Sequence, residues 1–306
     1  MGTPMPKPGN PLRRHTTRRR NGVAATLFLA PALILIVVLR ILPAVAAVGD
    51  STRRGLPGSL APPRNVGLAV FADLLRSPAF WQTVRQTLVF NVLVNPIQIV
   101  LALALAVLLT RNLPGSGLWR TIVFLPSAVP LAGSTIVWGI ALRPDGPVNG
   151  ALGLVGIPAQ PWFTSPTQVI AALIVLTSWI GIGYWMVFLI AGLGDIPASY
   201  FEAARIDGAG PLRTFFSITL PMLRRPLLFV LVADTVANFV LFAPVQMLTA
   251  GGPQKQSNFL MYDVFHRSYE LSDPYAASAE LLMLLILMIG IVAIQFRLLG
   301  SSDGTE

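Results

Sequence analysis

The sequence QVIAALIVLTSWIGIGYWMVFLIAGL, residues 168–193, contains no charged side chain. A helix needs about 20 apolar residues to cross the hydrocarbon core of a bilayer, so this run is long enough to form a transmembrane helix. A polar connection follows at 195–225, and another apolar run begins at Pro226. This order predicts two transmembrane helices, one before and one after a solvent-exposed segment.

The composition extends this interpretation to the whole chain. Of its 306 residues, 54% are hydrophobic and only 11% are charged, whereas a soluble domain carries about 25% charged residues. We therefore predict an all-α integral membrane protein, with a basic tail at 1–21 followed by one transmembrane domain at 22–299. Six segments have the length and apolar character of a membrane span: 22–48, 86–110, 121–142, 168–193, 226–250 and 276–296.

The distribution of basic residues predicts the orientation. The first 21 residues carry six of the 22 Lys and Arg residues, and such residues stay on the cytoplasmic side, against an anionic leaflet. With the N-terminus inside, the inner segments carry more Lys and Arg than the outer ones, so we expect an N-in, C-in topology. The first span also resembles a secretory signal with its cleavage site at 44–46, but its apolar run is too long, and we expect a retained helix.

Several kinds of chemistry are not expected. The chain has no cysteine, and its two histidines, His15 and His266, lie in different polar segments, so we predict no metal site and no catalytic thiol. The net charge of +9 comes without a DNA- or RNA-binding motif, so we expect no nucleic-acid partner. A membrane-embedded enzyme is also disfavoured, because no Ser/His/Asp set or pair of carboxylates stands in or beside the spans.

Two connections between spans carry a pattern. Val66, Val70, Leu74 and Leu75 have helical spacing, which predicts an amphipathic helix at the outer surface or a packed loop. The connection 146–160 is rich in Gly and Pro and reads as an irregular loop.

The connection 195–225 predicts a helix, a turn and a second helix between spans four and five. Pro197 suits the first turn of a helix over 198–207, and Gly208 suits its C-terminus. Gly210 and Pro211 then make a turn, and Pro211 can begin a second helix that ends near Pro221. A helix can lie in the groove of another protein and transmit a rigid-body motion.

The motif in this connection resembles a known family. The run Glu202-Ala203-Ala204-Arg205-Ile206-Asp207-Gly208, followed by Ile218-Thr219-Leu220-Pro221, closely resembles the EAA loop of binding-protein-dependent ABC importer permeases. The resemblance implies that this loop contacts a separate ATPase. The residues implied for that role are Glu202, Ala203, Ala204, Arg205, Asp207, Gly208, Ile218, Leu220 and Pro221.

Other features are similar to the sugar-permease branch of that family. They are Phe80-Trp81, Thr87-Leu88, Phe124-Leu125-Pro126, and Thr249 with Gly251-Gly252-Pro253. Arg40 departs from the branch, because an uncharged residue is usual at that place in the first span.

The resemblance implies a multi-pass protein of the bacterial cytoplasmic membrane, in contact with membrane lipid. Its implied partners are a second homologous permease, a dimeric ATPase that binds ATP and Mg²⁺, an extracytoplasmic solute-binding protein and a sugar-like substrate. This chain lacks the phosphate-loop pattern G-x-x-x-x-G-K-[ST], so we expect no cofactor of its own.

Polar residues inside the spans are candidates for substrate contact, because they are costly in a membrane. One set lies in the second span and another in or near the fifth, and amides with an aromatic ring would suit a hydroxyl-rich sugar. Such residues also serve as hydrogen-bond links between helices. The candidates are Asn91, Asn95, Gln98, Asp234, Asn238, Phe242 and Gln246.

Two alternatives stay open within transport. A permease for glycerol phosphate, amino acids, peptides or phosphate would share the EAA signature. An ion-driven secondary transporter is disfavoured, because only Arg40, Asp234 and Glu280 are ionisable within the predicted spans and no paired repeat is apparent.

Overall fold

The computed structural model describes residues 28–55, 62–111 and 114–300. The chain divides into two compact units, residues 1–50 and 51–306, which are described separately. In the first unit a helix runs over Phe28–Asp50. It contains a π-helical turn, η1 (Val37–Ile41), followed by α2 (Leu42–Asp50), and Arg40 lies within that turn.

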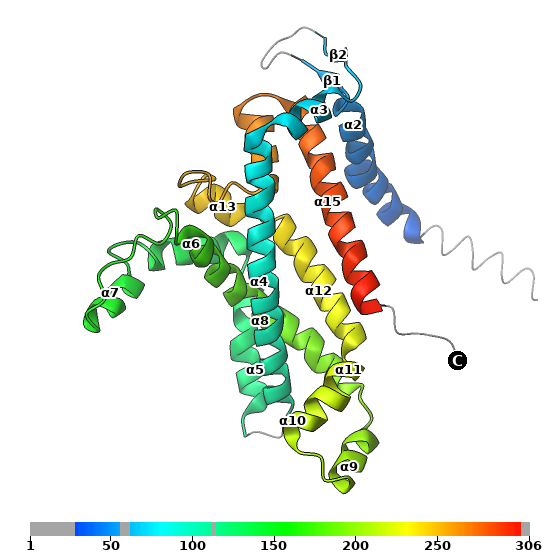
Figure 1. The fold of residues 1–306 in the computed structure, drawn as a ribbon, viewed down its shortest axis with the longest axis vertical. Coiled ribbons are helices and arrows are strands. Elements are labelled where there is room, and N and C mark those ends of the chain that lie inside the picture. The colour runs from blue at the N-terminus through cyan, green and yellow to red at the C-terminus, as the bar shows by residue number, and fades with distance from the viewer. Residues whose placement is uncertain (1–27, 56–61, 112–113, 301–306) are drawn as a thin grey trace, which may run out of the picture. The chain divides into compact units, whose positions relative to one another are not determined.

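Four long helices form the body of the second unit: α4 (Pro78–Thr110), α8 (Val169–Gly194), α12 (Arg224–Phe239) and α15 (Pro274–Gly300). α4 packs along α8, and α12 lies against both α4 and α15 (Figure 1). The three predicted spans that α4, α8 and α15 represent are confirmed as helices long and apolar enough to cross a membrane, as is the first span over its described residues. α4 begins earlier than expected, because Ser77 caps it and Pro78 occupies its first turn.

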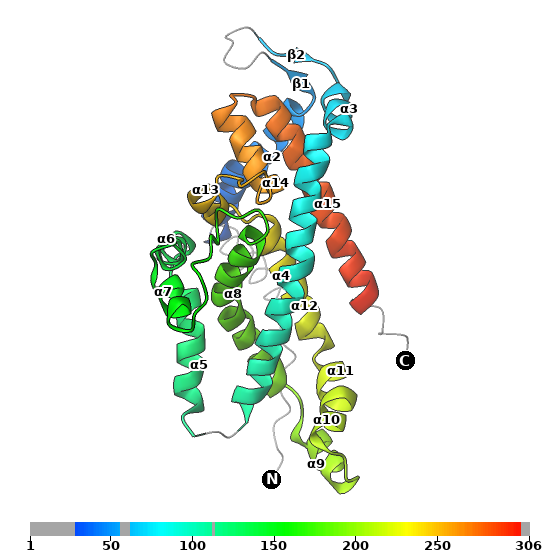
Figure 2. The ribbon, with the colours of Figure 1, turned by 60° about the vertical axis from the view of Figure 1, so that its left-hand side comes forward.

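The prediction of a single helix at 121–142 is wrong. Instead α5 (Ser116–Phe124) continues into the 3-10 turn η2 (Leu125–Ala128), and α6 (Leu131–Ala141) then follows at a 96° bend. Pro130 lacks the N–H that would continue the helix, and it forces Val129 into an extended conformation with ψ 132°. Figure 2 shows α6 turned away from the direction of α5.

The fifth span is long and apolar enough to cross a membrane over Arg224–Leu248, but its helix is interrupted. α12 ends at Phe239, and three residues separate it from α13 (Ala243–Leu248). Pro244 explains the interruption, because it cannot donate a hydrogen bond to Val240 and its ring excludes a helical carbonyl at that position.

One end of the second unit carries α3 (Ala69–Arg76), and the other carries α9 (Ala198–Ile206) (Figure 1). At the α3 end, β1 (Arg53–Arg54) pairs antiparallel with β2 (Arg64–Asn65). α3 buries Val70 and Leu74, so these two residues of the predicted stripe are helical and packed, whereas Val66 precedes the helix and Leu75 is exposed. The segment between α13 and α15 contains α14 (Leu260–Phe265) and the π-helical turn η4 (His266–Glu270).

The connection 146–160 is not irregular throughout, because α7 (Pro147–Leu154) forms within it. Pro147 is favourable at the start of a helix. The prediction of a loop gave more weight to the Gly and Pro content of the connection than to this signal. Asn149 fixes the segment that follows. Its Nδ2 donates to the carbonyls of Arg143 and Gln160, and its Oδ1 accepts from the Gln160 N–H and from Trp162 Nε1.

The core lies between the helices of the second unit in three clusters. One joins α4, α8 and α12 toward the α9 end, around Met186, Leu189 and Leu223. α5 approaches α8 closely at Gly183, where a Cβ would lie 2.0 Å from the Val123 carbonyl oxygen. The packing of the spans therefore depends on large apolar side chains and, at Gly183, on the absence of a side chain.

Candidate functional site

A helix, a turn and further helical turns form the α9 end of the second unit, as predicted. They are α9 (Ala198–Ile206), α10 (Pro211–Thr214), the π-helical turn η3 (Phe215–Thr219) and α11 (Leu220–Met222). We call residues 198–222 the inner element.

Gly208 ends α9 as the sequence predicted. Its φ is +69°, which a glycine adopts without strain. The Gly208 N–H donates to the Arg205 carbonyl and the Ala209 N–H donates to the Ala204 carbonyl, the bond pattern of a Schellman motif. These bonds satisfy carbonyls at the helix end, so the turn has a defined geometry.

The residues implied for ATPase contact do not all lie on one surface. Ala204 is only 6% exposed, so it contacts the chain's own core, whereas Ala203 beside it is available to a partner. Ile218 and Leu220 are half-buried. The remaining six are exposed: Glu202, Ala203, Arg205, Asp207, Gly208 and Pro221.

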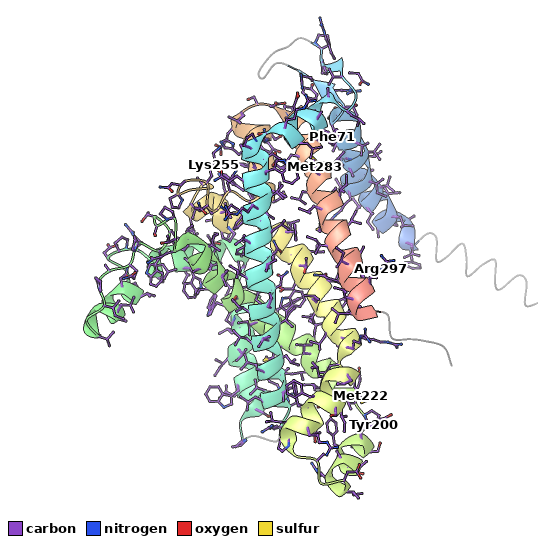
Figure 3. The ribbon with its side chains drawn as sticks, in the orientation of Figure 1. Phe71, Tyr200, Met222, Lys255, Met283 and Arg297 are labelled. Atoms are coloured by element: carbon purple, nitrogen blue, oxygen red, sulfur yellow. The ribbon has the colours of Figure 1, made fainter. Side chains whose placement is uncertain are left out.

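Large apolar side chains are also exposed on the inner element. Ile206 is 87% exposed and Leu212 is 75% exposed, and Tyr200, Phe216 and Met222 are exposed as well. Figure 3 shows Tyr200 and Met222 at this end of the unit. Contiguous exposed apolar residues next to charged ones mark surfaces that another molecule covers.

The opposite side of the inner element is held by the core. Phe201 packs against the cluster that contains Ile196 and Leu223, the residues that lead into and out of the element. A cavity of about 490 Å³ separates the element from the ends of α4 and α8. Arg111, Leu193 and Arg205 are among its lining residues. The element is thus attached to the core at its two ends and through Phe201, with the cavity beside these contacts.

A buried polar layer crosses the helices in the middle of the second unit. Asn238 Nδ2 lies 2.8 Å from Asn95 Oδ1, 3.3 Å from Gln98 Oε1 and 3.2 Å from Asp234 Oδ1. Asn95 Nδ2 donates to Thr235 Oγ1. The structure therefore brings together four of the predicted polar residues, from α4 and α12.

Two further helices reach the same layer. Trp185 Nε1 of α8 donates to Asp234 Oδ1 at 2.6 Å, and Gln295 Nε2 of α15 donates to Thr235 Oγ1 at 2.8 Å. None of Trp185, Thr235 and Gln295 was among the candidates from the sequence. A polar amide inside the last apolar run was a usable signal for Gln295, whereas nothing local distinguishes Trp185 from the other tryptophans. We call these seven residues the polar layer: Asn95, Gln98, Trp185, Asp234, Thr235, Asn238 and Gln295.

Asp234 has an unusual environment within the polar layer. It is 2% exposed, and its Oδ2 has no hydrogen-bond partner in the described part of the chain. None of the ion pairs among the described residues includes it. A buried acceptor without a partner is costly, so this atom is a candidate for contact with something outside the chain.

The other predicted pathway residues lie apart from the layer. Asn91 Nδ2 donates to the Thr87 carbonyl within α4, and Phe242 packs against Phe265 with ring centroids 4.7 Å apart. Gln246 lies on α13. Asn91 Oδ1 and Gln246 Oε1 are buried and have no hydrogen-bond partner in the described part of the chain.

Comparison with known sequences gives a family and close relatives. Residues 98–300 match the family model described as binding-protein-dependent transport system inner membrane component. The chain is 32% identical over 287 residues to the lactose transport system permease protein LacF of Rhizobium radiobacter, covering 92% of this chain and 95% of the relative. It is also 32% identical to the sn-glycerol-3-phosphate transport system permease protein UgpA of Agrobacterium fabrum, covering 90% and 94%.

Solved structures share the fold. A subunit of a bacterial ABC transporter involved in the import of the acidic polysaccharide alginate matches with a TM-score of 0.77 and 17% identity, covering 95% of this chain and all of that one. The alginate transporter in complex with its pentasaccharide-bound periplasmic protein gives a TM-score of 0.80 and 18% identity, with 92% and 95% covered.

Proposed function

Because the chain belongs to the family of binding-protein-dependent transport system inner membrane components, we propose that it forms half of the translocation pathway of an ATP-driven importer for a neutral, hydroxyl-rich substrate. The observation that carries this proposal is the inner element, which exposes Ile206, Leu212 and Phe216 beside the charged Glu202 and Arg205. A dimeric ATPase that binds ATP and Mg²⁺ is the partner that would cover this surface.

The attachment of the inner element supports a role in transmitting force. Ile196 connects it to α8, and Leu223 connects it to α12; both residues are buried in the same core cluster. A displacement of the element would therefore move the ends of two spans together. Closure of the ATPase would rock these helices and expose the pathway alternately to the two sides of the membrane.

The orientation follows from the same assignment. If the inner element faces the ATPase, the α9 end lies in the cytoplasm and the α3 end lies outside. The basic tail then lies in the cytoplasm, in agreement with the distribution of Lys and Arg. A solute-binding protein would deliver substrate at the α3 end, and a second permease would complete the pathway.

The chemistry of the polar layer favours a sugar over a phosphorylated substrate. One relative is named for lactose and another for sn-glycerol 3-phosphate. A phosphate group needs cationic partners, but the polar layer consists of amides, a hydroxyl, an indole and a carboxylate, without Lys or Arg. Amides and carboxylates match sugar hydroxyls, which both donate and accept hydrogen bonds.

Three buried acceptors are the proposed points of contact. Asn91 Oδ1, Asp234 Oδ2 and Gln246 Oε1 have no hydrogen-bond partner among the described residues. Hydroxyl groups of a passing sugar would supply the missing donors, and Phe242 offers a ring face on which a sugar can pack. The interhelical bonds of Asn95, Gln98 and Asn238 leave these side chains mainly a role in holding α4 against α12.

The test uses the complete complex in proteoliposomes. The chain is reconstituted with the second permease, the ATPase and the solute-binding protein, and ATP hydrolysis is measured with mono- and disaccharides and with glycerol 3-phosphate. We expect stimulation by a sugar only. Stimulation by glycerol 3-phosphate would overturn the substrate assignment, and uptake by this chain alone under a proton or sodium gradient would overturn the importer assignment.

A further inference from the structure

A chain of polar contacts joins α4 to α15 at the α3 end of the second unit. Asn258 Nδ2 lies 2.9 Å from Thr83 Oγ1 of α4 and 3.1 Å from Asp263 Oδ1 of α14. Arg267 Nε of η4 donates to Asp263 Oδ2 at 2.8 Å and lies 2.5 Å from Glu280 Oε2 of α15. We call these five residues the polar bridge.

The polar bridge contains two carboxyl groups and one guanidinium in a buried place. Glu280 is 0% exposed, and Asp263 is also buried. Two ionised carboxylates beside one Arg267 would leave an uncompensated negative charge there, and like charges in one site oppose each other's ionisation. Charge balance therefore requires that one of the two acids is neutral.

The contacts indicate which acid is ionised. Arg267 Nε carries one hydrogen, which it donates to Asp263, and neither oxygen of Glu280 accepts a hydrogen bond from the described residues. Burial alone would raise the pKa of Asp263, but the Arg267 guanidinium and the hydrogen bonds from Asn258 and Arg267 outweigh it and hold that pKa below its ordinary value. Asp263 is the carboxylate, and Glu280 is the neutral acid, with its Oε2 beside Arg267 Nε.

The segment held by the polar bridge is the loop between α13 and α14. Ala250, Gly251, Gln254 and Lys255 all have positive φ, so the loop has a sharply turned backbone. Figure 3 shows Lys255 at this end of the unit. Asn258 lies at the end of the loop. Its Nδ2 joins the loop to α4 through Thr83 and to α14 through Asp263.

α15 connects the polar bridge to the polar layer. Glu280 and Gln295 lie on this one helix, 15 residues apart, which corresponds to about 22 Å at a rise of 1.5 Å per residue. Gln295 donates to Thr235 of α12, and α12 leads into the inner element through Leu223. A displacement of the loop can thus be transmitted to the α9 end through the continuous contacts of α15 and α12.

We propose that the polar bridge is a positioning site, in which Arg267 lies between Asp263 and neutral Glu280 and so fixes the loop 249–258 relative to α4 and α15. This inference rests on the proposed function, because the loop lies at the end where the solute-binding protein would dock. Through α15, the polar bridge sets how strongly docking there stimulates ATP hydrolysis at the other end.

The test compares two substitutions of one residue in the reconstituted complex. Glu280→Gln keeps the size and a polar group beside Arg267 without a charge, and Glu280→Leu keeps the size without the polar group. Neither leaves a charge unpaired, because the Asp263–Arg267 pair remains, so both variants should fold. Basal ATP hydrolysis, hydrolysis with substrate-loaded binding protein, and thermal stability are measured for each.

We expect Glu280→Gln to retain the stimulation by the binding protein. For Glu280→Leu, stimulation should fall at least about fivefold, the lower end of known coupling effects, with basal hydrolysis unchanged. Loss of stimulation in Glu280→Gln would overturn the neutral-acid assignment. A changed melting temperature with normal stimulation in Glu280→Leu would overturn the positioning role. Failure of the wild-type complex to respond to any binding protein would instead contradict the proposed function.

Discussion

The inner element and the polar layer both depart from the usual arrangement, in which apolar side chains are buried and polar ones are exposed. The inner element exposes large apolar side chains, such as Ile206, Leu212 and Phe216, and the backbone bonds at its turn are local. The polar layer buries amides and a carboxylate, and its hydrogen bonds join α4, α8, α12 and α15.

The two arrangements have different physical consequences. Exposed apolar surface contributes favourable free energy only when a partner covers it. The inner element therefore stabilises an assembly and not the isolated chain. A buried polar group is stabilising only while its partners are present, so the polar layer fixes the packing within the chain. Substitutions in the inner element should therefore change transport at constant stability, and substitutions in the polar layer should change stability first.

The largest effect should come from Gly208→Pro. Proline fixes φ near −65° and has no N–H, whereas Gly208 has φ +69° and donates to the Arg205 carbonyl. The turn of the inner element is then lost, because proline can reproduce neither this φ nor this hydrogen bond. We expect substrate uptake in proteoliposomes to fall to background.

The matched control is Gly210→Ala. Gly210 has φ −70° and ψ 167°, and nothing lies within 4 Å of an added Cβ, so uptake should be retained. Both variants should melt within about 2 °C of the wild type in detergent, because the turn contributes little to the core. Normal uptake by Gly208→Pro would show that the inner element does not couple the ATPase.

The next effect should come from Asn238→Leu in the polar layer. The substitution removes the donor for Asn95 Oδ1, Gln98 Oε1 and Asp234 Oδ1, and each orphaned buried acceptor costs about 1–3 kcal/mol. Trp185 still satisfies Asp234 Oδ1, so two acceptors are orphaned and we expect a loss of roughly 2–6 kcal/mol in detergent-titration unfolding.

ATPase binding provides the control for Asn238→Leu. The purified variant should still capture the ATPase from solution with unchanged affinity, since the inner element is not touched. Phe229→Leu on the exposed side of α12 should leave stability nearly unaltered. Unchanged stability together with an altered sugar response in Asn238→Leu would make this residue a substrate contact instead of a link between helices.

A smaller effect is expected from Ile206→Ser. Ile206 is 87% exposed, so its loss cannot open a cavity in the chain. If the ATPase covers it, about 1.5 kcal/mol of apolar burial is lost, which corresponds to roughly a tenfold weaker affinity. Leu154→Ser is the control, because Leu154 is 88% exposed but lies on α7, outside the inner element. Equal affinity for the ATPase in both variants would contradict the proposed docking surface.

The same contrast explains what could be predicted from the sequence. The inner element was predictable because its signals are local: Pro197, Gly208 and Pro211 determine where its helices begin and end. The break at Val129 also had a local cause, in Pro126 and Pro130, but the apolar run around them dominated the interpretation.

The polar layer was only partly predictable, because its partners are distant in sequence. The sequence singled out Asn95, Gln98, Asp234 and Asn238 as polar residues within apolar spans. It could not indicate that Trp185 donates to Asp234 across 49 positions. The polar bridge was missed for the same reason, since Asp263 and Glu280 lie on different elements.

The smallest effect should come from Trp185→Phe, which removes one donor from the polar layer. Phenylalanine keeps an aromatic ring in the cluster with Tyr184 and Phe188 but cannot donate to Asp234 Oδ1. The loss should be about 1 kcal/mol if the carboxyl group is neutral, and about 1.5–3 kcal/mol if it is ionised, because bonds to charged groups are stronger.

Trp179→Phe is the control, since Trp179 is partly exposed and packs only edge-on against Trp138 among the described aromatic contacts. Equal losses in the two variants would mean that ring volume alone matters at Trp185. A larger loss at Trp185, retained in the presence of saturating ATPase, would show that the bond to Asp234 stabilises the chain independently of the partner that the inner element binds.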